Sequence, residues 1–485
     1  MPSEQAPADA RESVHGMGGG PPTIVSAPGA LPHFPGHSAV FVANLMGLFF
    51  GNEAKTRMLA EQVGEVDSYG GRLLPVVDLL FRGPGRNLLV LEREADPALT
   101  RYLGEGLGLS LPETMVLPHD EYLRIGRALS EGTALRHEAI DRIAAHPSGW
   151  MDGYVTDETL AAVAAATGKR TLSTPGGSHR GNNKLLLLHH VEAAGLPVVP
   201  TELAASPAEV PGCLRRLRQM GFTAAVVKSP IGASGIGLIK VDHLDDRSRG
   251  LRGARGEPSV PEHFFLDGPC LVQGWLTPGE GGITRIRSPS VQMYLDPATV
   301  TLFDLTEQIL SQSSVHEGNE SPPPWLDQDP SIGEDLLRQA GVAARWLHAQ
   351  GYRGTASVDF LVAEGTEERE DGATVYICEI NARVTGATYP SLLAHHLLPG
   401  GAWLMRNLRF REPLEGQDIL DRLAYAGDLF EAGRSRAGVL PVNFNFGEDG
   451  RVHKGQFLCL APTTRGSEFL LRMAEADLPC ASDRD

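Results

Sequence analysis

The sequence predicts an α/β (α+β) protein built in several parts, and two observations carry this prediction. Between residues 38 and 180, apolar strand-like runs alternate with helical patterns, which is typical of a small α/β domain. From Asn182 onward, longer strands are separated by glycine-rich turns and polar loops, so a second organisation begins there. A chain of 485 residues, 42% of them hydrophobic, has room for about two to four domains.

The expected elements follow in chain order. Residues 1–37 are rich in proline and glycine and are expected to form a disordered tail. The first region has expected strands at Ala39–Leu45, Asn87–Leu91, Met115–Leu117 and Gly149–Val155, with its clearest helix at Asp157–Thr167. The second has expected helices at Lys184–Ala194, Pro207–Met220 and Gly333–Gln350, and strands at Ala224–Lys228, Cys270–Leu276, Val291–Leu295, Thr299–Leu305, Thr355–Val362 and Thr374–Ile380. Loops are expected at Asp245–Glu262 and His316–Ser331, and a short mixed region after residue 400, with a helix at Gln417–Glu431 and strands near Val439–Phe446 and Gln456–Leu460.

Charge and composition exclude several classes of protein. The chain has 43 basic and 60 acidic residues, a net charge of −17, and no dense basic stripe, so nucleic acid and anionic membranes are not expected as partners. No apolar run approaches the roughly 20 residues of a membrane span, and residues 1–37 lack a signal-peptide pattern. The five cysteines include no CxxC pair, which argues against a disulfide framework or a zinc cluster. A cytoplasmic protein is expected.

A strand followed by small residues gives the first candidate site. Val226–Gly237 reads VVKSPIGASGIG and precedes the apolar run Leu238–Val241, so a hairpin with a small-residue turn is expected. Backbone N–H groups of that turn and the Ser234 hydroxyl can approach phosphate oxygens, with the Lys228 ammonium beside them. Only six of the basic residues are lysine, so a lysine here favours phosphate binding over a plain hairpin that needs glycine for its turn.

Two carboxylates are expected to face each other on neighbouring strands. The segment Cys378–Arg383 reads CEINAR, and its Glu379, Asn381 and Arg383 share one face because strand side chains alternate. Asp359 lies in the preceding strand, and a simple hairpin centred on position 369 places it opposite Glu379, about 5 Å away. Facing oxygen ligands without His or Cys suit Mg²⁺; the alternative is a solvated strand face with an asparagine at its end.

A third motif lies at Leu271–Glu280, which reads LVQGWLTPGE. An apolar strand runs into a turn and then a carboxylate. Peptide groups near Gly274 and Leu276 could pair with the edge of an adenine, and Glu280 could accept ribose hydroxyls. Taken alone, the pattern favours an edge strand followed by a turn.

In their order and spacing, the three motifs resemble the ATP-grasp superfamily of carboxylate–amine ligases, over about residues 181–400. The hinge and the glycine-rich loop resemble those of D-alanine–D-alanine ligase. Glu-Ile-Asn-Ala-Arg resembles the ExNxR motif of biotin carboxylase and L-amino-acid ligases. As a whole, the chain is similar to the peptide ligases of antibiotic biosynthesis, of the pheganomycin type.

The resemblance implies an ATP-grasp fold in five parts. After the tail of residues 1–37 come a pre-ATP-grasp α/β domain at 38–180, a lid subdomain at 181–275, a metal and substrate subdomain at 276–400, and a small C-terminal domain at 401–485. The two expected loops would be lids over the site.

The resemblance also implies ligands and their residues. The cofactors would be ATP and one or two Mg²⁺ ions, with Mn²⁺ as a substitute, and the metal ligands would be Asp359, Glu379 and Asn381. Nucleotide-binding residues would be Lys184, Lys228, Gly232, Ala233, Ser234, Gly235, Gly237, Gln273, Gly274, Leu276 and Glu280. Catalytic groups would be Arg383, Lys228 and Arg285; because D-alanine–D-alanine ligase has an arginine where this chain has Ser357, Arg285 or Arg287 would replace it.

The implied reaction joins a small carboxylic acid or amino acid donor to an amine or peptide acceptor through an acyl phosphate. Two alternatives stay open: a kinase on the same fold, since both need the same ATP site, and a non-catalytic ATP-binding scaffold. A homodimer is also open.

His189-His190 and His395-His396 lie on expected helices, where adjacent side chains point apart, so neither pair is expected to share a metal.

Overall fold

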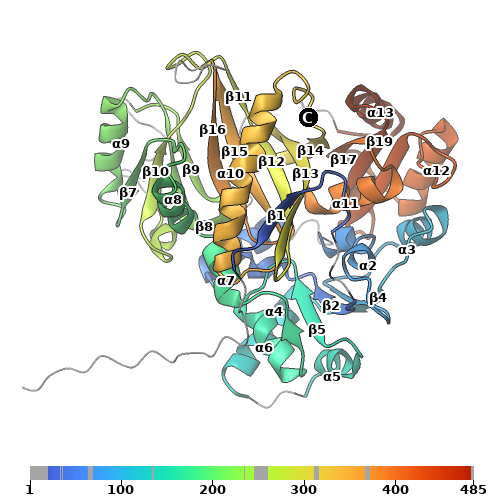
Figure 1. Ribbon diagram of the computed structural model, residues 1–485. Helices are drawn as coiled ribbons and strands as arrows, with labels where there is room; N and C mark the ends of the chain where they lie inside the picture. Colours follow the sequence, from blue (N-terminus) through green and yellow to red (C-terminus); the bar gives the residue numbers. More distant parts are fainter. Residues whose placement is uncertain are drawn as a thin grey trace, which may run out of the picture.

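The computed structural model describes residues 20–32, 34, 36–63, 69–133, 136–233, 235–244, 260–310, 316–365 and 372–481. These residues form three sheets. Figure 1 shows a large central sheet, a smaller green sheet to one side of it, and a blue-to-teal α/β layer below it. None of the helices in the described ranges combines the length and the apolar character that a bilayer crossing needs.

The N-terminal sheet has five parallel strands in the order β4-β3-β2-β5-β6. Its strands β2 and β3 are buried on both faces, as their uninterrupted apolar sequences AVFV and LLVL require. The strands are β2 (Ala39–Val42), β3 (Leu88–Leu91), β4 (Glu113–Val116), β5 (Trp150–Gly153) and β6 (Arg170–Thr171). The helices are α1 (Glu53–Val63), α2 (Val77–Leu80), α3 (Pro97–Arg101), α4 (His119–Ser130), α5 (Glu138–Ala145), α6 (Glu158–Ala166) and α7 (Pro175–Gly181).

The second sheet has four strands in the order β7-β10-β8-β9, all antiparallel to their neighbours. Its elements are α8 (Lys184–Ala193), β7 (Thr201–Ala204), α9 (Val210–Gln219), β8 (Ala225–Ala233), β9 (Ile236–Val241) and β10 (Cys270–Gly274). Asn183 caps α8 by accepting hydrogen bonds from the backbone N–H groups of Leu185 and Leu186. The cap fixes the start of the helix, and with it the position of Lys184.

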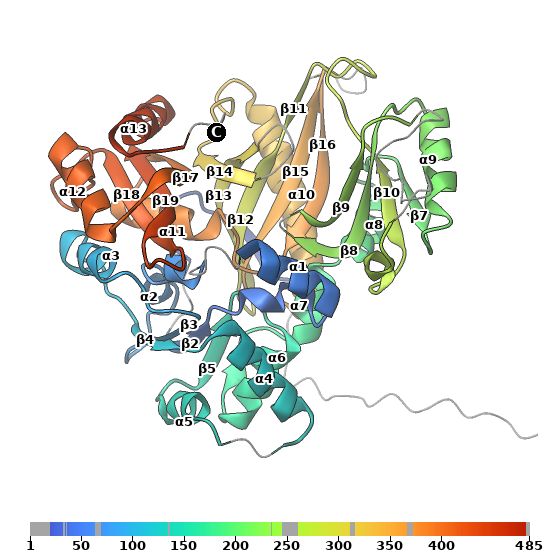
Figure 2. The same ribbon diagram turned by 180° about the vertical axis from the view of Figure 1, so that it is seen from behind.

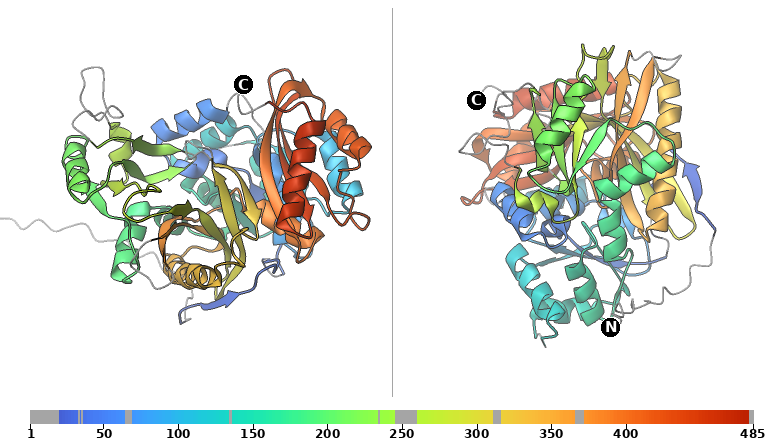
Figure 3. Two further views of the ribbon diagram at one scale, coloured as in Figure 1. Left: turned by 90° about the horizontal axis from the view of Figure 1, so that it is seen from above. Right: turned by 90° about the vertical axis from the view of Figure 1, so that its left-hand side faces the viewer.

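The central sheet has ten strands, in the order β11-β15-β12-β13-β14-β17-β19-β18, with β16 beside β15 and β1 beside β13. The strands are β1 (Thr23–Ser26), β11 (Arg285–Arg287), β12 (Pro289–Leu295), β13 (Thr299–Leu310), β14 (His316–Ser321), β15 (Gly354–Glu364), β16 (Ala373–Asn381), β17 (Ala402–Leu414), β18 (Gly438–Phe446) and β19 (Val452–Ala461). Its helices are α10 (Pro330–Ala349), α11 (Thr388–Leu397), α12 (Gly416–Ala426) and α13 (Thr464–Asp477). Helix α10 lies along one face of this sheet (Figure 3), and its apolar side chains form a core with those of β12, β13, β15 and β16.

The expected tail of residues 1–37 is wrong over its described part, which begins at residue 20; residues 1–19 lie outside the described residues. Thr23–Ser26 is strand β1, paired in parallel with β13, and Ile24 packs against the core under α10, where Gly341 leaves room for it. Phe34 stacks edge-on against Trp150 at 5.3 Å between ring centroids. The proline and glycine residues around the short TIVS strand hid it in the sequence.

The expected loop at His316–Ser331 is also wrong at both ends. His316–Ser321 is strand β14, and Pro330 already belongs to α10. The strand HEGNES has no apolar period, because its buried Asn319 and Ser321 side chains lie within a polar sheet face rather than in an apolar core. The other expected lid, Asp245–Glu262, lies outside the described residues over positions 245–259.

The sheet does not break at residue 400. Strand β17 pairs with β14 and is followed in the sheet by β19 and β18. Residues after 400 therefore extend the central sheet instead of forming a separate layer. One apolar core also joins them to the N-terminal domain, since it contains Phe41 of β2 together with Phe444 of β18 and Leu460 of β19.

Candidate active site

The predicted register of the two carboxylates is confirmed. In the β15–β16 ladder, Asp359 lies directly opposite Glu379, and Ser357 lies opposite Asn381. The amide Nδ2 of Asn381 donates to Asp359 Oδ2 at 2.9 Å. Two carboxylates and one amide therefore meet on one face, and the described residues contain no group of three His, Cys, Asp or Glu side chains that could hold a metal instead.

The pKa values of the two carboxylates are shifted in opposite directions. Burial, with the charge of Glu379 added to it, raises the pKa of Asp359 to about 6. For Glu379, burial also acts to raise the pKa, but the Lys184 ammonium at 2.8 Å, with Arg383 and Lys228 behind it, outweighs burial and lowers that pKa. A divalent cation between them would remove the repulsion, so the pair fits Mg²⁺.

The two predicted lysines lie between the four-stranded sheet and strand β16. Lys184 Nζ donates to the carbonyl oxygen of Gly232 at 3.0 Å, and it pairs with Glu379 on the other side. Lys228 Nζ donates to Gln273 Oε1 at 2.8 Å and lies 3.8 Å from Cys378 Sγ. Figure 2 shows β8 and β9 facing the strands β15 and β16. Helix α8 and strand β8 thus bring two cations toward the carboxylate pair.

The glycine-rich turn joins β8 to β9 as predicted. Gly235 and Gly237 have φ of +80° and +86°, the left-handed region that favours glycine. A Cβ on Gly232 would lie 2.7 Å from the carbonyl oxygen of Ile236, so only glycine fits where the two strands meet. Ala233 is the last residue of β8, and Ser234 lies outside the described residues.

The hinge after β10 differs from the expectation at one residue. The N–H of Gly274 donates to the carbonyl oxygen of Pro200 at 2.9 Å, so it cannot donate to an adenine. Gly274 instead makes room for Phe222, whose ring carbon would lie 2.4 Å from a Cβ at that position. The N–H of Leu276 has no backbone partner within the described ranges. Glu280 accepts hydrogen bonds from Thr223 at 2.7 and 2.9 Å.

Arg383 lies at the carboxylates. Its Nη1 donates to Asn182 Oδ1 at 3.1 Å and to Asn381 Oδ1. These contacts hold the guanidinium beside the metal-ligand candidates.

Arg285 and Arg287 lie elsewhere, which corrects the prediction that one of them serves the site. Glu364 is five residues from Asp359 on β15, so the two side chains point to opposite faces of the sheet. Arg285 lies directly opposite Glu364 in the β11–β15 ladder and shares its face. Arg287 pairs with Glu364 and with Asp329 on the α10 side.

Two contributors were not predicted. Ser290 Oγ on β12 donates to Asp359 Oδ1 at 2.6 Å, and the polar alternation of Ser290 and Gln292 within an apolar strand was the available signal. Lys55 of α1 is fully buried and donates to Ser229 Oγ and to the carbonyl oxygen of Ile231 at 2.5 and 2.7 Å. It ties the start of the glycine-rich turn to the N-terminal domain.

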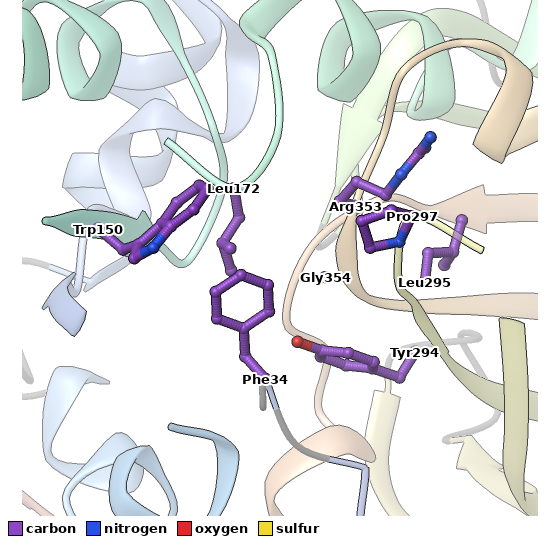
Figure 4. A pocket seen from close by; sticks show the side chains of 8 residues that line it. All are labelled: Phe34, Trp150, Leu172, Tyr294, Leu295, Pro297, Arg353 and Gly354. Carbon is purple, nitrogen blue, oxygen red and sulfur yellow. The ribbon is translucent and has the colours of Figure 1, made fainter. Parts of the chain in front are cut away.

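A cavity of about 60 Å³ lies away from the carboxylates, between the N-terminal domain and the far end of β12. Figure 4 shows Phe34, Trp150 and Leu172 on one side of it and Tyr294 and Pro297 on the other. Ligand pockets occupy roughly 300–1,000 Å³, so this cavity is too small for a nucleotide.

The fold and this arrangement define a protein of the ATP-grasp fold. One solved structure that shares it is a biotin carboxylase from Campylobacter jejuni in complex with an ATP analogue, with 14% identity and a TM-score of 0.54 over 92% of each chain. Another is the biotin carboxylase domain of the Hydrogenobacter thermophilus 2-oxoglutarate carboxylase with MgADP, with 13% identity and a TM-score of 0.52 over 92% of this chain and 91% of that one. An N5-carboxyaminoimidazole ribonucleotide synthetase with ADP has 13% identity and a TM-score of 0.51 over 92% of this chain and 97% of that one.

Among curated proteins, the chain is similar to a [butirosin acyl-carrier protein]–L-glutamate ligase from Niallia circulans, with 24% identity over 303 residues. The match covers 61% of this chain and 63% of that ligase. No family model matches the chain.

Proposed function

We propose that the protein is an ATP-dependent ligase that forms an amide bond between a carboxylate donor and an amine or peptide acceptor. The observation that carries this proposal is the facing pair Asp359 and Glu379, approached by Lys184 from the start of helix α8. The curated relative is itself a ligase named for an amino acid, L-glutamate, which supports carboxylate–amine chemistry.

ATP would lie between the four-stranded sheet and β16. Lys184, Lys228 and Arg383 supply three cationic groups against two carboxylates, which complements a triphosphate. The turn at Gly232–Gly237 would cover the phosphates, and Leu276 N–H and Gln273 would hold the adenine. Mg²⁺, held by Asp359, Glu379 and Asn381, would neutralise the charge on the phosphate oxygens.

The chemistry follows from the weakness of a carboxylate as an acyl donor. A donor carboxylate oxygen attacks the γ-phosphorus, the bond to the β–γ bridging oxygen breaks, and ADP leaves. Lys228 and Arg383 would bind the oxygens that carry charge during this transfer. The acceptor amine then attacks the acyl carbon, inorganic phosphate leaves, and the amine nitrogen loses a proton.

A hydroxylamine trap tests the proposal. Protein, ATP, Mg²⁺ and a panel of amino acids and other small carboxylic acids are incubated with hydroxylamine, and products are read by mass spectrometry. An ATP-dependent hydroxamate is expected and would identify the donor. ATP consumption that yields a stable phosphorylated compound and no hydroxamate would favour the kinase, and no ATP consumption with any acid would favour the scaffold.

We infer further that the reaction belongs to peptide natural-product biosynthesis, as the curated relative suggests, and takes place in the cytoplasm. All five cysteines are free thiols, which suits a reducing compartment. A homodimer stays a prediction.

A further inference from the structure

One polar face of the central sheet continues from the carboxylates to the last strands. The ladders connect Asp359 on β15 to Ser290 on β12 and Thr306 on β13, and then connect Gln308 on β13 to Asn319 on β14. Beyond β14 the same face carries Asn407 and Arg409 of β17, Gln456 and Lys454 of β19, and Asn443 and Asn445 of β18. A sheet face without function would be apolar under a covering layer, so this run of polar residues requires an explanation.

Cations gather at the far end of that face. Burial, with the nearby charges of Arg409 and Arg72, lowers the pKa of Lys454 to about 8. Burial also lowers the pKa of His316, and Arg72, Lys454 and Arg406 act in the same direction. We call Arg72, Arg409 and Lys454 the cationic cluster, and the His316 ring lies beside it. Arg406, next to Asn407 on β17, points to the opposite face of the sheet and pairs there with Glu317 at 3.1 Å. Lys454 has no ion pair or side-chain hydrogen bond to any described residue.

Buried polar atoms beside the cluster lack partners. Gln456 is 3% exposed and Asn445 is 2% exposed, yet Gln456 Oε1 and Asn445 Nδ2 accept and donate no hydrogen bond within the described residues. Asn445 lies directly opposite Lys454, and Gln456 lies two residues further on the same strand face. Leaving such buried atoms unpaired is unfavourable. Asn445 Nδ2 is a donor and is suited to a bound anion, whereas Gln456 Oε1 is an acceptor and needs an N–H or O–H group from elsewhere in a bound molecule.

The cluster is continuous with the candidate active site. His316 packs against Gly386, five residues beyond Asn381: a Cβ on Gly386 would lie 3.1 Å from the His316 ring. Strands lie about 4.8 Å apart, so β14 and β19 are about 14 and 24 Å from β15 along a flat sheet, and closer along a curved one. An extended chain of about four to seven residues spans such distances.

We propose that the cationic cluster binds an oxyanion, a carboxylate or a phosphate, at the far end of an elongated substrate other than ATP. This inference rests on the proposed function: the reacting group of the same substrate would lie at the carboxylates. A carboxylate would be the C-terminal end of a peptide acceptor. A phosphate would belong to a substrate that is attached to a phosphate-bearing carrier group.

The test measures anion binding without turnover, so it does not depend on ligase activity. Isothermal titration calorimetry is performed on the full chain saturated with MgADP, with glutarate and inorganic phosphate as probes at constant ionic strength. Wild type is expected to bind at least one probe, and Lys454→Met is expected to weaken that binding at least about tenfold. Lys454→Arg should retain it. Arg451→Met, which removes one charge from an exposed residue three positions away, should match wild type.

The pattern of outcomes decides the proposal. Preference for glutarate or for phosphate identifies which source of oxyanion the cluster fits. If wild type binds neither probe, if Lys454→Met binds as wild type does, or if Arg451→Met loses as much affinity, the proposal is overturned. Unchanged MgADP affinity shows that Lys454→Met is folded; should it not fold, Arg409→Gln, at an exposed position on the same face, takes its place. A hydroxamate in the hydroxylamine trap together with no anion binding in this titration would support the ligase function and overturn the anion site.

Discussion

Glu379 has two roles at the candidate site, and a single substitution can test them without unfolding the protein. It is the candidate metal ligand opposite Asp359, and it is the partner of Lys184. Glu379→Ala is expected to lower ATP-dependent turnover at least about a hundredfold, the scale for losing one group that stabilises transition-state charge. Because the substitution also removes repulsion with Asp359, the unfolding midpoint should change by no more than about 4 °C.

Turnover is measured as ADP release and stability by circular dichroism. The matched control is Glu412→Ala, which removes a carboxylate from an exposed position on β17 and should keep full activity. A fully active Glu379→Ala protein would refute the metal assignment.

Lys454 gives the proposed anion site a characteristic pH dependence. Its pKa is lowered to about 8 by burial and by Arg409 and Arg72, and anion binding needs its charged form. Glutarate affinity should therefore fall as the pH rises through 8, by about tenfold between pH 7 and pH 9. Lys454→Arg should remove this dependence, because a guanidinium stays charged over that range. Equal pH profiles for the two proteins would contradict the assignment.

At the scale of single elements, local patterns predicted what short-range geometry decides. The β15–β16 hairpin fixed Asp359 opposite Glu379, and the small-residue run fixed the β8–β9 turn. Strand β14 was missed because its buried side chains Asn319 and Ser321 are polar, so its sequence lacks apolar alternation. Strand β17 was missed because its first four residues, AWLM, are buried on both faces and the following residues are mixed, so it shows no alternation either. Arg285 was misplaced for a related reason: its face follows from pairing between β11 and β15, which no local pattern encodes.

A substitution in the β8–β9 turn tests whether the conformation of this turn matters for ATP binding. Ala at position 237 would have to adopt φ near +86°, and its Cβ would lie 3.2 Å from Ser229 Cβ and 3.3 Å from Gly232 Cα. Lys55 holds Ser229 in place, so the turn itself must move. Gly237→Ala is therefore expected to weaken ATP binding at least about tenfold, measured by calorimetry.

Gly221→Ala is the matched control for that variant. Gly221 also has positive φ, +99°, but nothing lies within 4 Å of its added Cβ. It should lose about 1–2 kcal/mol of stability through backbone strain alone and bind ATP as wild type does. If Gly237→Ala binds ATP equally well, the turn does not contact the nucleotide.

At the scale of the whole molecule, the C-terminal residues and the N-terminal domain share one core. The Tyr102 hydroxyl donates to the carbonyl oxygen of Phe430 at 2.6 Å, and burial raises the pKa of Tyr102. Trp403 on β17 is fully buried and its Nε1 donates to Asp304 Oδ2 on β13 at 3.2 Å. Residues that lie more than 300 positions apart in sequence therefore stabilise each other, and a boundary at residue 400 is not expected to separate independent folding units.

Truncation at residue 400 tests this directly. Removing β17 leaves β14 as an unpaired edge and exposes the apolar side chains that Phe444 and Leu460 cover. The fragment 1–400 is expected to aggregate or to melt without a cooperative transition, as followed by circular dichroism and size-exclusion chromatography, whereas a fragment ending at residue 481 keeps every described contact and should melt like the full chain. A soluble 1–400 fragment that melts cooperatively and binds MgADP would show instead that the C-terminal strands are an independent addition to the ATP-binding sheet.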